Sequence, residues 1–139
     1  MGFIVIPVVR QNLWYNLTDD VLCSANTERS TSSTSYVKVK EFTVENTVNA
    51  GSYLRFTFEM KSSVNGQSVS GVLLQNAIQL GVEKSMTSST YAAQTQDLAA
   101  TLNIGDTISL WHKKNGTGDC YVKNFQIRGI GSGFSLLTD

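Results

Sequence analysis

The chain has 139 residues, and its 11 basic and 11 acidic residues give a formal net charge of zero at pH 7. A chain of this length can bury one hydrophobic core without disulfides or a metal. The charge balance lacks the basic excess typical of nucleic-acid binding, and no apolar run approaches the ~20 residues that span a bilayer. We therefore expect one globular domain that binds neither nucleic acid nor a membrane.

The first 18 residues contain an apolar segment, FIVIPVV at 3–9, and then a Trp-Tyr pair. The segment lacks a basic leader and a small-residue cleavage site, so it does not read as a signal peptide. Proline is tolerated mainly in edge strands, which favours an edge strand or an arm that docks on a neighbouring subunit. We expect residues 1–18 to form this arm. Its predicted interface side chains are Phe3, Ile4, Val5, Ile6, Trp14 and Tyr15.

A Ser/Thr-rich motif occurs twice, as ERSTSSTSY at 28–36 and as EKSMTSSTY at 83–91. The two copies share their first Glu, two Ser and their last Tyr. Each copy is followed by an Asn-x-Gly turn, at 49–51 and at 103–105, and then by alternating apolar residues. Because an internal repeat reflects a repeated structural unit, the chain is expected to consist of two similar halves.

Alternation with a period of two predicts short strands separated by Asn and Gly turn residues. Segment 92–100 has helical propensity, but its counterpart in the first copy is VKVKEFTVE, which alternates as a strand. The pattern predicts an all-β protein, an antiparallel β-sandwich of the jelly-roll type with about eight strands, over residues 19–129. The expected strands, with the arm included, are 3–9, 20–25, 36–44, 53–61, 68–75, 78–82, 91–98, 107–113 and 121–128.

The alternation also assigns side chains to faces, because residues two apart share a face of a strand. In 53–61 the even positions, Leu and Phe among them, face the core. In 107–113 His112 faces inward and Trp111 faces outward. In 36–44 the apolar positions change parity after Val39, which predicts a β-bulge near Lys40.

The sequence favours a protein that is not an enzyme. His112 is the one histidine, it falls on an inward position, and its counterpart in the first copy is Phe58. A core histidine therefore fits better than a general base. No GxSxG, HExxH or P-loop motif occurs.

The two cysteines and several aspartates leave alternatives open. Cys23 and Cys120 lie without CxxC spacing, and they either form a disulfide or remain two buried thiols. Aspartates beside predicted turns either hold a structural calcium or are solvated turn residues, and we favour the second alternative, with no cofactor and no metal. These aspartates are Asp19, Asp20, Asp97, Asp106 and Asp119.

Exposed aromatic side chains beside charged groups are typical of sugar-binding surfaces, because a sugar ring stacks on a flat apolar ring. If strands 53–61 and 107–113 are neighbours, one such patch can form. It contains Tyr53, Arg55, Glu59, Trp111 and Lys113. The same residue types anchor protein interfaces, and we favour an interface over a sugar site.

The C-terminal residues 130–139 are expected to form a tail behind a glycine-rich hinge, GIGSG at 129–133. Three apolar side chains of the tail are predicted to contribute to an interface. They are Phe134, Leu136 and Leu137.

The string ERSTSSTSYVKVKEFTV, with the closing YVKNFQIRG, resembles small Ser/Thr-rich jelly-roll domains in virion proteins of tailed phages and archaeal viruses, and in secreted proteins of thermophiles. The resemblance covers residues 26–129. It implies a jelly roll used for surface structure or attachment, similar in shape to carbohydrate-binding modules. No shared active site accompanies it, so it transfers no functional residue.

These observations favour a structural protein that self-assembles on a virion surface or decorates a capsid. It would act as a homo-oligomer, for example a trimer, or bind a coat protein, because apolar arms and tails commonly add a strand to a neighbouring sheet. The alternative is an extracellular carbohydrate-binding module or a receptor-binding head, and a third hypothesis is a secreted filament subunit.

Overall fold

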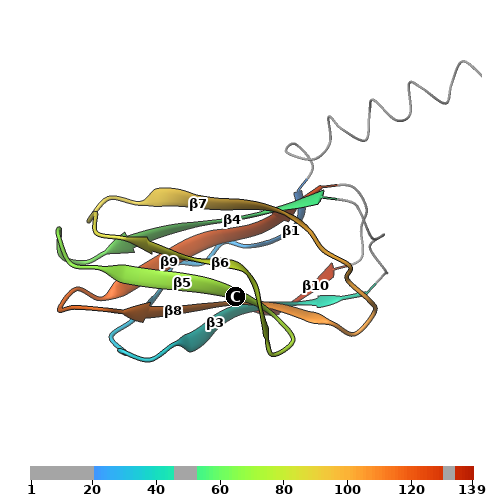
Figure 1. Ribbon diagram of the computed structural model, residues 1–139, viewed down its shortest axis with the longest axis horizontal. Helices are drawn as coiled ribbons and strands as arrows, with labels where there is room; N and C mark the ends of the chain where they lie inside the picture. Colours follow the sequence, from blue (N-terminus) through green and yellow to red (C-terminus); the bar gives the residue numbers. More distant parts are fainter. Residues whose placement is uncertain (1–20, 46–52, 130–133) are drawn as a thin grey trace, which may run out of the picture.

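The fold is taken from a computed structural model that describes residues 21–45, 53–129 and 134–139. In these ranges the chain forms ten strands in two antiparallel sheets that stack face to face (Figure 1). The predicted all-β sandwich is confirmed, and no helix in the described ranges could cross a membrane. The predicted strand 3–9 and the predicted arm contacts lie outside these ranges, and so do Asp19 and Asp20.

Each sheet has five strands. Sheet A has the order β1 (Val21–Ala25), β9 (Cys120–Arg128), β4 (Tyr53–Ser62) and β7 (Ala92–Ala99), with β2 (Arg29–Thr31) also paired to β9. Sheet B has the order β10 (Phe134–Thr138), β3 (Val37–Val44), β8 (Thr107–Lys114), β5 (Val69–Gln75) and β6 (Ile78–Met86). Strand β2 has no counterpart among the predicted strands, because three residues are too few to show alternation.

The sequence repeat is a repeat of structure. Adding 55 to the bounds of β3 gives those of β7, and adding 55 to the bounds of β2 gives residues 84–86 at the end of β6. Strands β2, β9, β4 and β7 of sheet A correspond in order to β6, β5, β8 and β3 of sheet B. The two halves are therefore related by a pseudo-twofold operation that exchanges the sheets.

The ladder register corrects one pairing expected from the sequence. Val37 lies opposite His112, and its counterpart Ala92 lies opposite Met60. The structural counterpart of His112 is thus Met60, and the expected pairing with Phe58 is wrong. The shift arises because β3 carries an extra residue that β7 lacks and because the turns between these strands differ in length.

That extra residue is the predicted β-bulge. The register of β3 on β8 shifts between Lys38 and Lys40, which places the bulge at Val39. As a result, Lys40 lies opposite the inward residue Leu110 and its side chain is fully buried between the sheets. The bulge therefore lets the apolar residues on both sides of Val39 face the core, and it also turns the charged residue Lys40 inward.

The core fills the space between the sheets with the apolar residues that the alternation placed there. Leu54 and Met60 of β4 are fully buried, and the rings of Phe42 and Phe125 pack with centroids 5.2 Å apart. His112 is buried among them, as predicted, at 1% exposure. Burial of this apolar surface supplies the main stabilisation of the sandwich.

Polar side chains close both open sides of the sandwich. At the β6–β7 side, Gln96 accepts a hydrogen bond from the Val82 N–H at 2.8 Å and donates one to the Val82 carbonyl at 3.1 Å. At the opposite side, Lys40 donates to the Thr27 carbonyl at 2.6 Å and to the Asp139 carboxylate at 2.9 Å. Gln96 thus ties β7 of sheet A to β6 of sheet B, and Lys40 ties β3 of sheet B to the segment between β1 and β2 of sheet A.

The expected C-terminal tail is in part a strand of the sandwich. Strand β10 pairs with β3 at the edge of sheet B, with Phe134 opposite Val44. Phe134 packs against the core of its own chain, whereas Leu136 and Leu137 are exposed. The interface role predicted for these two leucines stays a prediction.

Candidate functional site

The outer face of sheet A carries side chains in rows across β7, β4 and β9. From Arg55 to Lys61, the outward residues of β4 have a neighbour on β9 and another at or just before β7, because β4 is paired with both strands. From one end to the other, the rows are Tyr91–Lys61–Tyr121, Ala93–Glu59–Lys123, Thr95–Thr57–Gln126 and Asp97–Arg55–Arg128. Successive rows are about 7 Å apart, since two strand residues separate them.

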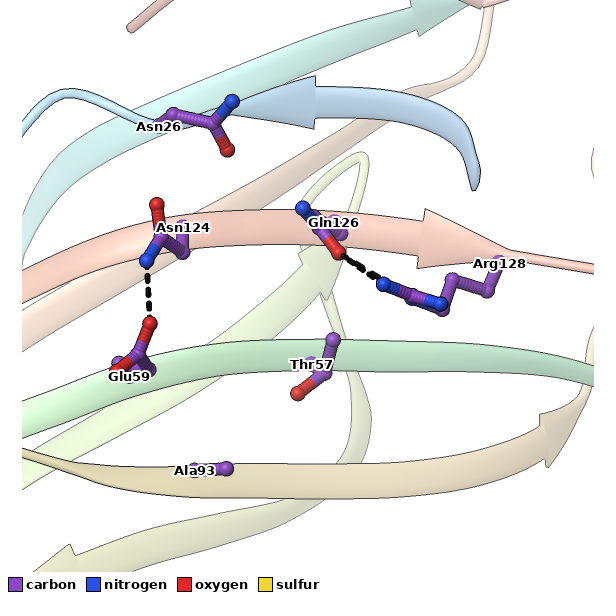
Figure 2. Close-up of a pocket in the computed structure, with 7 residues that line it drawn as sticks. All are labelled: Asn26, Thr57, Glu59, Ala93, Asn124, Gln126 and Arg128. Atoms are coloured by element: carbon purple, nitrogen blue, oxygen red, sulfur yellow. Dashed lines mark hydrogen bonds between the residues drawn. The ribbon is translucent and has the colours of Figure 1, made fainter. Parts of the chain in front are cut away.

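The three rows beyond Lys61 surround an open groove with a volume of about 450 Å³ (Figure 2). This volume lies in the usual range of ligand sites. Asn26 reaches the groove from the end of β1, and the small Ala93 side chain leaves space on the β7 side. The lining residues are Asn26, Thr57, Glu59, Ala93, Asn124, Gln126 and Arg128.

A second β-bulge shapes this groove. The register of β9 on β4 shifts between Thr57 and Glu59, and Asn124 has a positive φ of 53°. Asparagine tolerates this left-handed conformation better than most residues. The bulge turns both Lys123 and Asn124 outward, and the Asn124 amide donates a hydrogen bond to the Glu59 carboxylate (Figure 2).

The far end of the groove is ordered by paired polar groups. Arg55 donates two hydrogen bonds to Asp97, at 2.7 and 2.8 Å, and this pairing lowers the pKa of the Asp97 carboxyl. The Arg128 guanidinium donates to the Gln126 side-chain oxygen at 3.0 Å (Figure 2). These contacts fix the side-chain orientations before any ligand binds.

The other end of the face carries two tyrosines and two lysines. The ammonium of Lys61 lies 4.7 Å from the Tyr91 ring centroid and 5.2 Å from that of Tyr121. Lys123 lies 4.3 Å from the Tyr91 centroid. The Tyr91 hydroxyl donates to Glu28 at 2.5 Å, and burial together with this carboxylate raises the pKa of Tyr91.

The structure does not bring the predicted five-residue patch together. Three of its residues lie on β4 in sheet A, but Trp111 and Lys113 lie on β8 in sheet B. The two outer faces point away from each other. Trp111 is half-buried and donates its indole N–H to the Ser109 hydroxyl at 2.8 Å.

The sequence analysis did not identify the β9 half of the groove, and it did not identify Tyr91 and Tyr121 beside Lys61. One signal was present. The apolar positions of YVKNFQIR change parity between Val122 and Phe125, as they do after Val39, and this change indicates a bulge that exposes adjacent polar residues. No signal in the sequence alone shows that β9 lies beside β4.

The titratable core residues are unsuited to catalysis. Burial and the nearby Lys40 charge lower the pKa of His112 to about 4, and its Nδ1 has no hydrogen-bond partner among the described residues. Burial raises the pKa of Cys23 to about 12, and it raises that of Cys120 to about 12 as well. Both groups remain thiols near neutral pH, with little nucleophilic character.

The possible disulfide between Cys23 and Cys120 is not formed, and both cysteines are free. Cys23 lies opposite Ile127, whereas Cys120 is at the other end of the same strand, β9. Positions 120 and 127 are seven residues apart along β9, roughly 23 Å at about 3.3 Å per residue. A disulfide requires Cα atoms within about 7 Å.

The aspartates considered as calcium ligands are dispersed. Asp97 pairs with Arg55, and Asp106 accepts hydrogen bonds from the Gln75 and Asn76 side chains. Asp119 lies 3.9 Å from the ammonium of Lys114. Within the described ranges no three potential metal ligands cluster.

The chain is thus an antiparallel jelly-roll sandwich with a polar groove on the outer face of one sheet. No family model matches the chain, and no curated protein matches it. Solved structures do. The C-terminal domain of the sugar-binding protein EclA is 10% identical with a TM-score of 0.52, over 74% of this chain and 78% of that one.

Two further solved structures are carbohydrate-binding proteins. A carbohydrate-binding module of Cellvibrio mixtus lichenase 5A, in complex with cellotriose, is 13% identical with a TM-score of 0.46, over 80% of this chain and 99% of that one. The N-terminal modules of Clostridium thermocellum endo-1,4-β-D-xylanase 10B, complexed with xylohexaose, are 9% identical with a TM-score of 0.49. The match covers 82% of this chain and 29% of that one. At these identities the likeness concerns the fold alone.

Proposed function

We propose that this protein is a non-catalytic carbohydrate-binding domain, and that the groove on the outer face of sheet A holds a glycan. The observation that carries the proposal is the groove itself. It combines amide, carboxylate and guanidinium groups of β4 and β9 on one open surface, with tyrosine rings beyond Glu59. The one histidine, His112, is buried between the sheets and takes no part in this surface.

The chemistry of the groove suits a polyhydroxylated ligand. Each sugar hydroxyl both donates and accepts hydrogen bonds, and the amides of Asn124 and Gln126 do the same. The Glu59 carboxylate adds an acceptor and Arg128 adds donors. Since the side chains are already held by Asn124–Glu59 and Gln126–Arg128 hydrogen bonds, binding loses less side-chain entropy.

Two further features support the proposal. The groove is open, and the rows of polar side chains continue past it toward Tyr91 and toward Tyr53, which suits a chain of sugar units. The fold is shared with the EclA C-terminal domain, a domain described as part of a sugar-binding protein. In this proposal the protein acts outside the cell, where glycan chains are exposed.

The test begins with a glycan array and continues with titration calorimetry on the best ligand. Gln126→Ala and Glu59→Ala are expected to weaken binding at least tenfold, because each removes polar contacts to sugar hydroxyls. Trp111→Ala is the matched control, since Trp111 is the counterpart of Glu59 on the outer face of sheet B. If Trp111→Ala abolishes binding and the groove variants do not, the groove is the wrong site.

A second candidate is the self-assembling virion or capsid protein that the sequence favours. One observation supports it. Leu136 and Leu137 are 47% and 55% exposed on β10, and among the described residues β10 is an edge strand that is paired on one side only. Deletion of residues 1–13 and measurement of mass in solution test this candidate. A monomeric parent protein, or an oligomer that the deletion leaves unchanged, would count against it.

A further inference from the structure

The end of sheet A that carries Tyr91 and Lys61 has a counterpart on sheet B. Side chains that occur at both ends are common to the two halves, whereas side chains that occur only on sheet A distinguish the face with the groove. The pseudo-twofold operation relates Tyr91 and Lys61 to Tyr36 and Lys113. In both places the lysine lies over the tyrosine, at 4.7 Å in sheet A and at 4.8 Å in sheet B. A lysine over a tyrosine is thus a common feature of both halves.

Sheet A adds two groups that sheet B lacks. Lys123 of β9 lies opposite Glu59 of β4, and the residue in the equivalent place on β5 is Val72. Tyr121 lies beside Lys61, and its equivalent on β5 is Ser70. A second cation and a second aromatic ring therefore occur on the face with the groove.

The two ammonium groups of this end lack anionic partners. Lys38, Lys40 and Lys114 each have a carboxylate oxygen within 4 Å, but in the described part of the chain Lys61 and Lys123 have none. Two carboxylates accept hydrogen bonds from neutral donors of the same region, Glu28 from Tyr91 and Glu59 from Asn124. Among the described residues, no ion pair therefore neutralises the charge of Lys61 or of Lys123.

We propose that Lys61 and Lys123 form an anion subsite, so that the glycan held by the groove carries an acidic group, either a uronic acid carboxylate or a sulfate ester. This inference rests on the proposed carbohydrate-binding function. The ammonium groups of Lys61 and Lys123 both lie within 5 Å of the Tyr91 ring centroid, and two cations this close to one point can bind one anion by charge-assisted hydrogen bonds. Lys123 lies in the same row as Glu59 and Lys61 lies one row beyond it, so one ligand can contact both the subsite and the groove.

The test is an array of matched oligosaccharides that are neutral, uronic-acid-containing or sulfated, read at low and at high salt. Acidic glycans are expected to bind at least tenfold more tightly than their carboxyl-reduced or desulfated counterparts, and salt is expected to weaken them selectively. A preference for uronic acids or for sulfates identifies the source of the anion. Lys61→Gln with Lys123→Gln is expected to remove the preference.

Lys113→Gln is the matched control, because Lys113 is the counterpart of Lys61 on the other face. It is expected to leave binding unchanged. Equal binding of acidic and neutral glycans, or an unchanged preference in the double variant, overturns the anion subsite while the carbohydrate-binding function stands. The absence of binding to any glycan overturns the proposed function and the subsite with it. Thermal unfolding of each variant confirms that it remains folded.

Discussion

Tyr91, the last residue of the second Ser/Thr-rich motif, donates its phenolic hydrogen bond to Glu28, the first residue of the first motif. The reverse contact also exists, from Tyr36 at the end of the first motif to Glu83 at the start of the second. The residues that make the two motifs recognisable are therefore the residues that bind the motifs to each other.

The Tyr36–Glu83 contact is expected to contribute about 1 kcal/mol, because it involves a charged acceptor but lies near the surface. Tyr36→Phe should lower the free energy of unfolding by this amount. Glu83→Gln should then add little in the Tyr36→Phe background, as measured by urea unfolding in a double-mutant cycle. Tyr53→Phe, at an exposed tyrosine, serves as the control. Fully additive effects would show that the contact contributes nothing.

We expect the protein to lose stability in mild acid, because burial lowers the pKa of His112. Its pKa falls from an unfolded value near 6.5 to about 4 in the folded protein. The unfolded chain thus binds a proton before the folded protein does, and stability falls as the pH decreases from about 6.5 to about 4. The expected loss is roughly 3 kcal/mol. Urea unfolding of His112→Leu should show a flatter pH profile in this window, and an identical slope would contradict the assignment.

Replacing one member of the Lys40–Asp139 ion pair is expected to destabilise the protein more than replacing both. Asp139→Asn should destabilise the protein by about 2 kcal/mol, because it leaves the ammonium of a fully buried lysine without its counter-ion. Lys40→Met should recover most of this loss in the double variant. Lys38→Met, at an exposed lysine, is the control and should change stability by less than about 0.5 kcal/mol. If Asp139→Asn unfolds like the parent, the pair is not important for stability.

The same pair adds a second step at lower pH. The Lys40 ammonium and the Thr27 hydrogen bonds lower the pKa of Asp139 below its usual value. A lowered carboxyl pKa stabilises the fold above the unfolded pKa of about 3.9, and this contribution is lost as the pH falls through the folded pKa. The His112→Leu variant should therefore retain an acid transition below about pH 4.

Asn124 allows backbone shape and ligand contact to be separated. Asn124→Gly keeps the positive φ at little cost but removes the amide, so glycan affinity should fall while stability is maintained. Asn124→Val opposes the positive φ and should lower stability by 1 to 2 kcal/mol, roughly, as thermal unfolding would show. Tight glycan binding by the glycine variant would exclude a role for the amide.

Much of the fold could be predicted because the repeat and the alternation agree. The Ala-rich segment 92–99 is a strand, as its likeness to 37–44 predicts, and the parity change after Val39 is a bulge. The alternation locates these features because it depends only on neighbours along the chain. Buried and exposed faces follow from the same local information.

The site was harder to predict because it depends on which strands are neighbours. The predicted patch required strands 53–61 and 107–113 to be neighbours. They are β4 and β8, which are counterparts in opposite sheets. Trp111 is thereby separated from Glu59. The neighbours of Glu59 are Ala93 and Lys123, which are distant in sequence and have no distinctive motif.

The strand order has a consequence for how the chain acquires its structure. In the described ranges every ladder joins one of the strands β1 to β5 with one of the strands β6 to β10. A nascent chain that ends before Ile78 can close none of these ladders. Cleavage in the β5–β6 turn would yield two fragments that should stay unfolded apart and refold when mixed. This domain is thus suited to fragment complementation, in which association of the pieces would be read out as recovery of the proposed glycan binding.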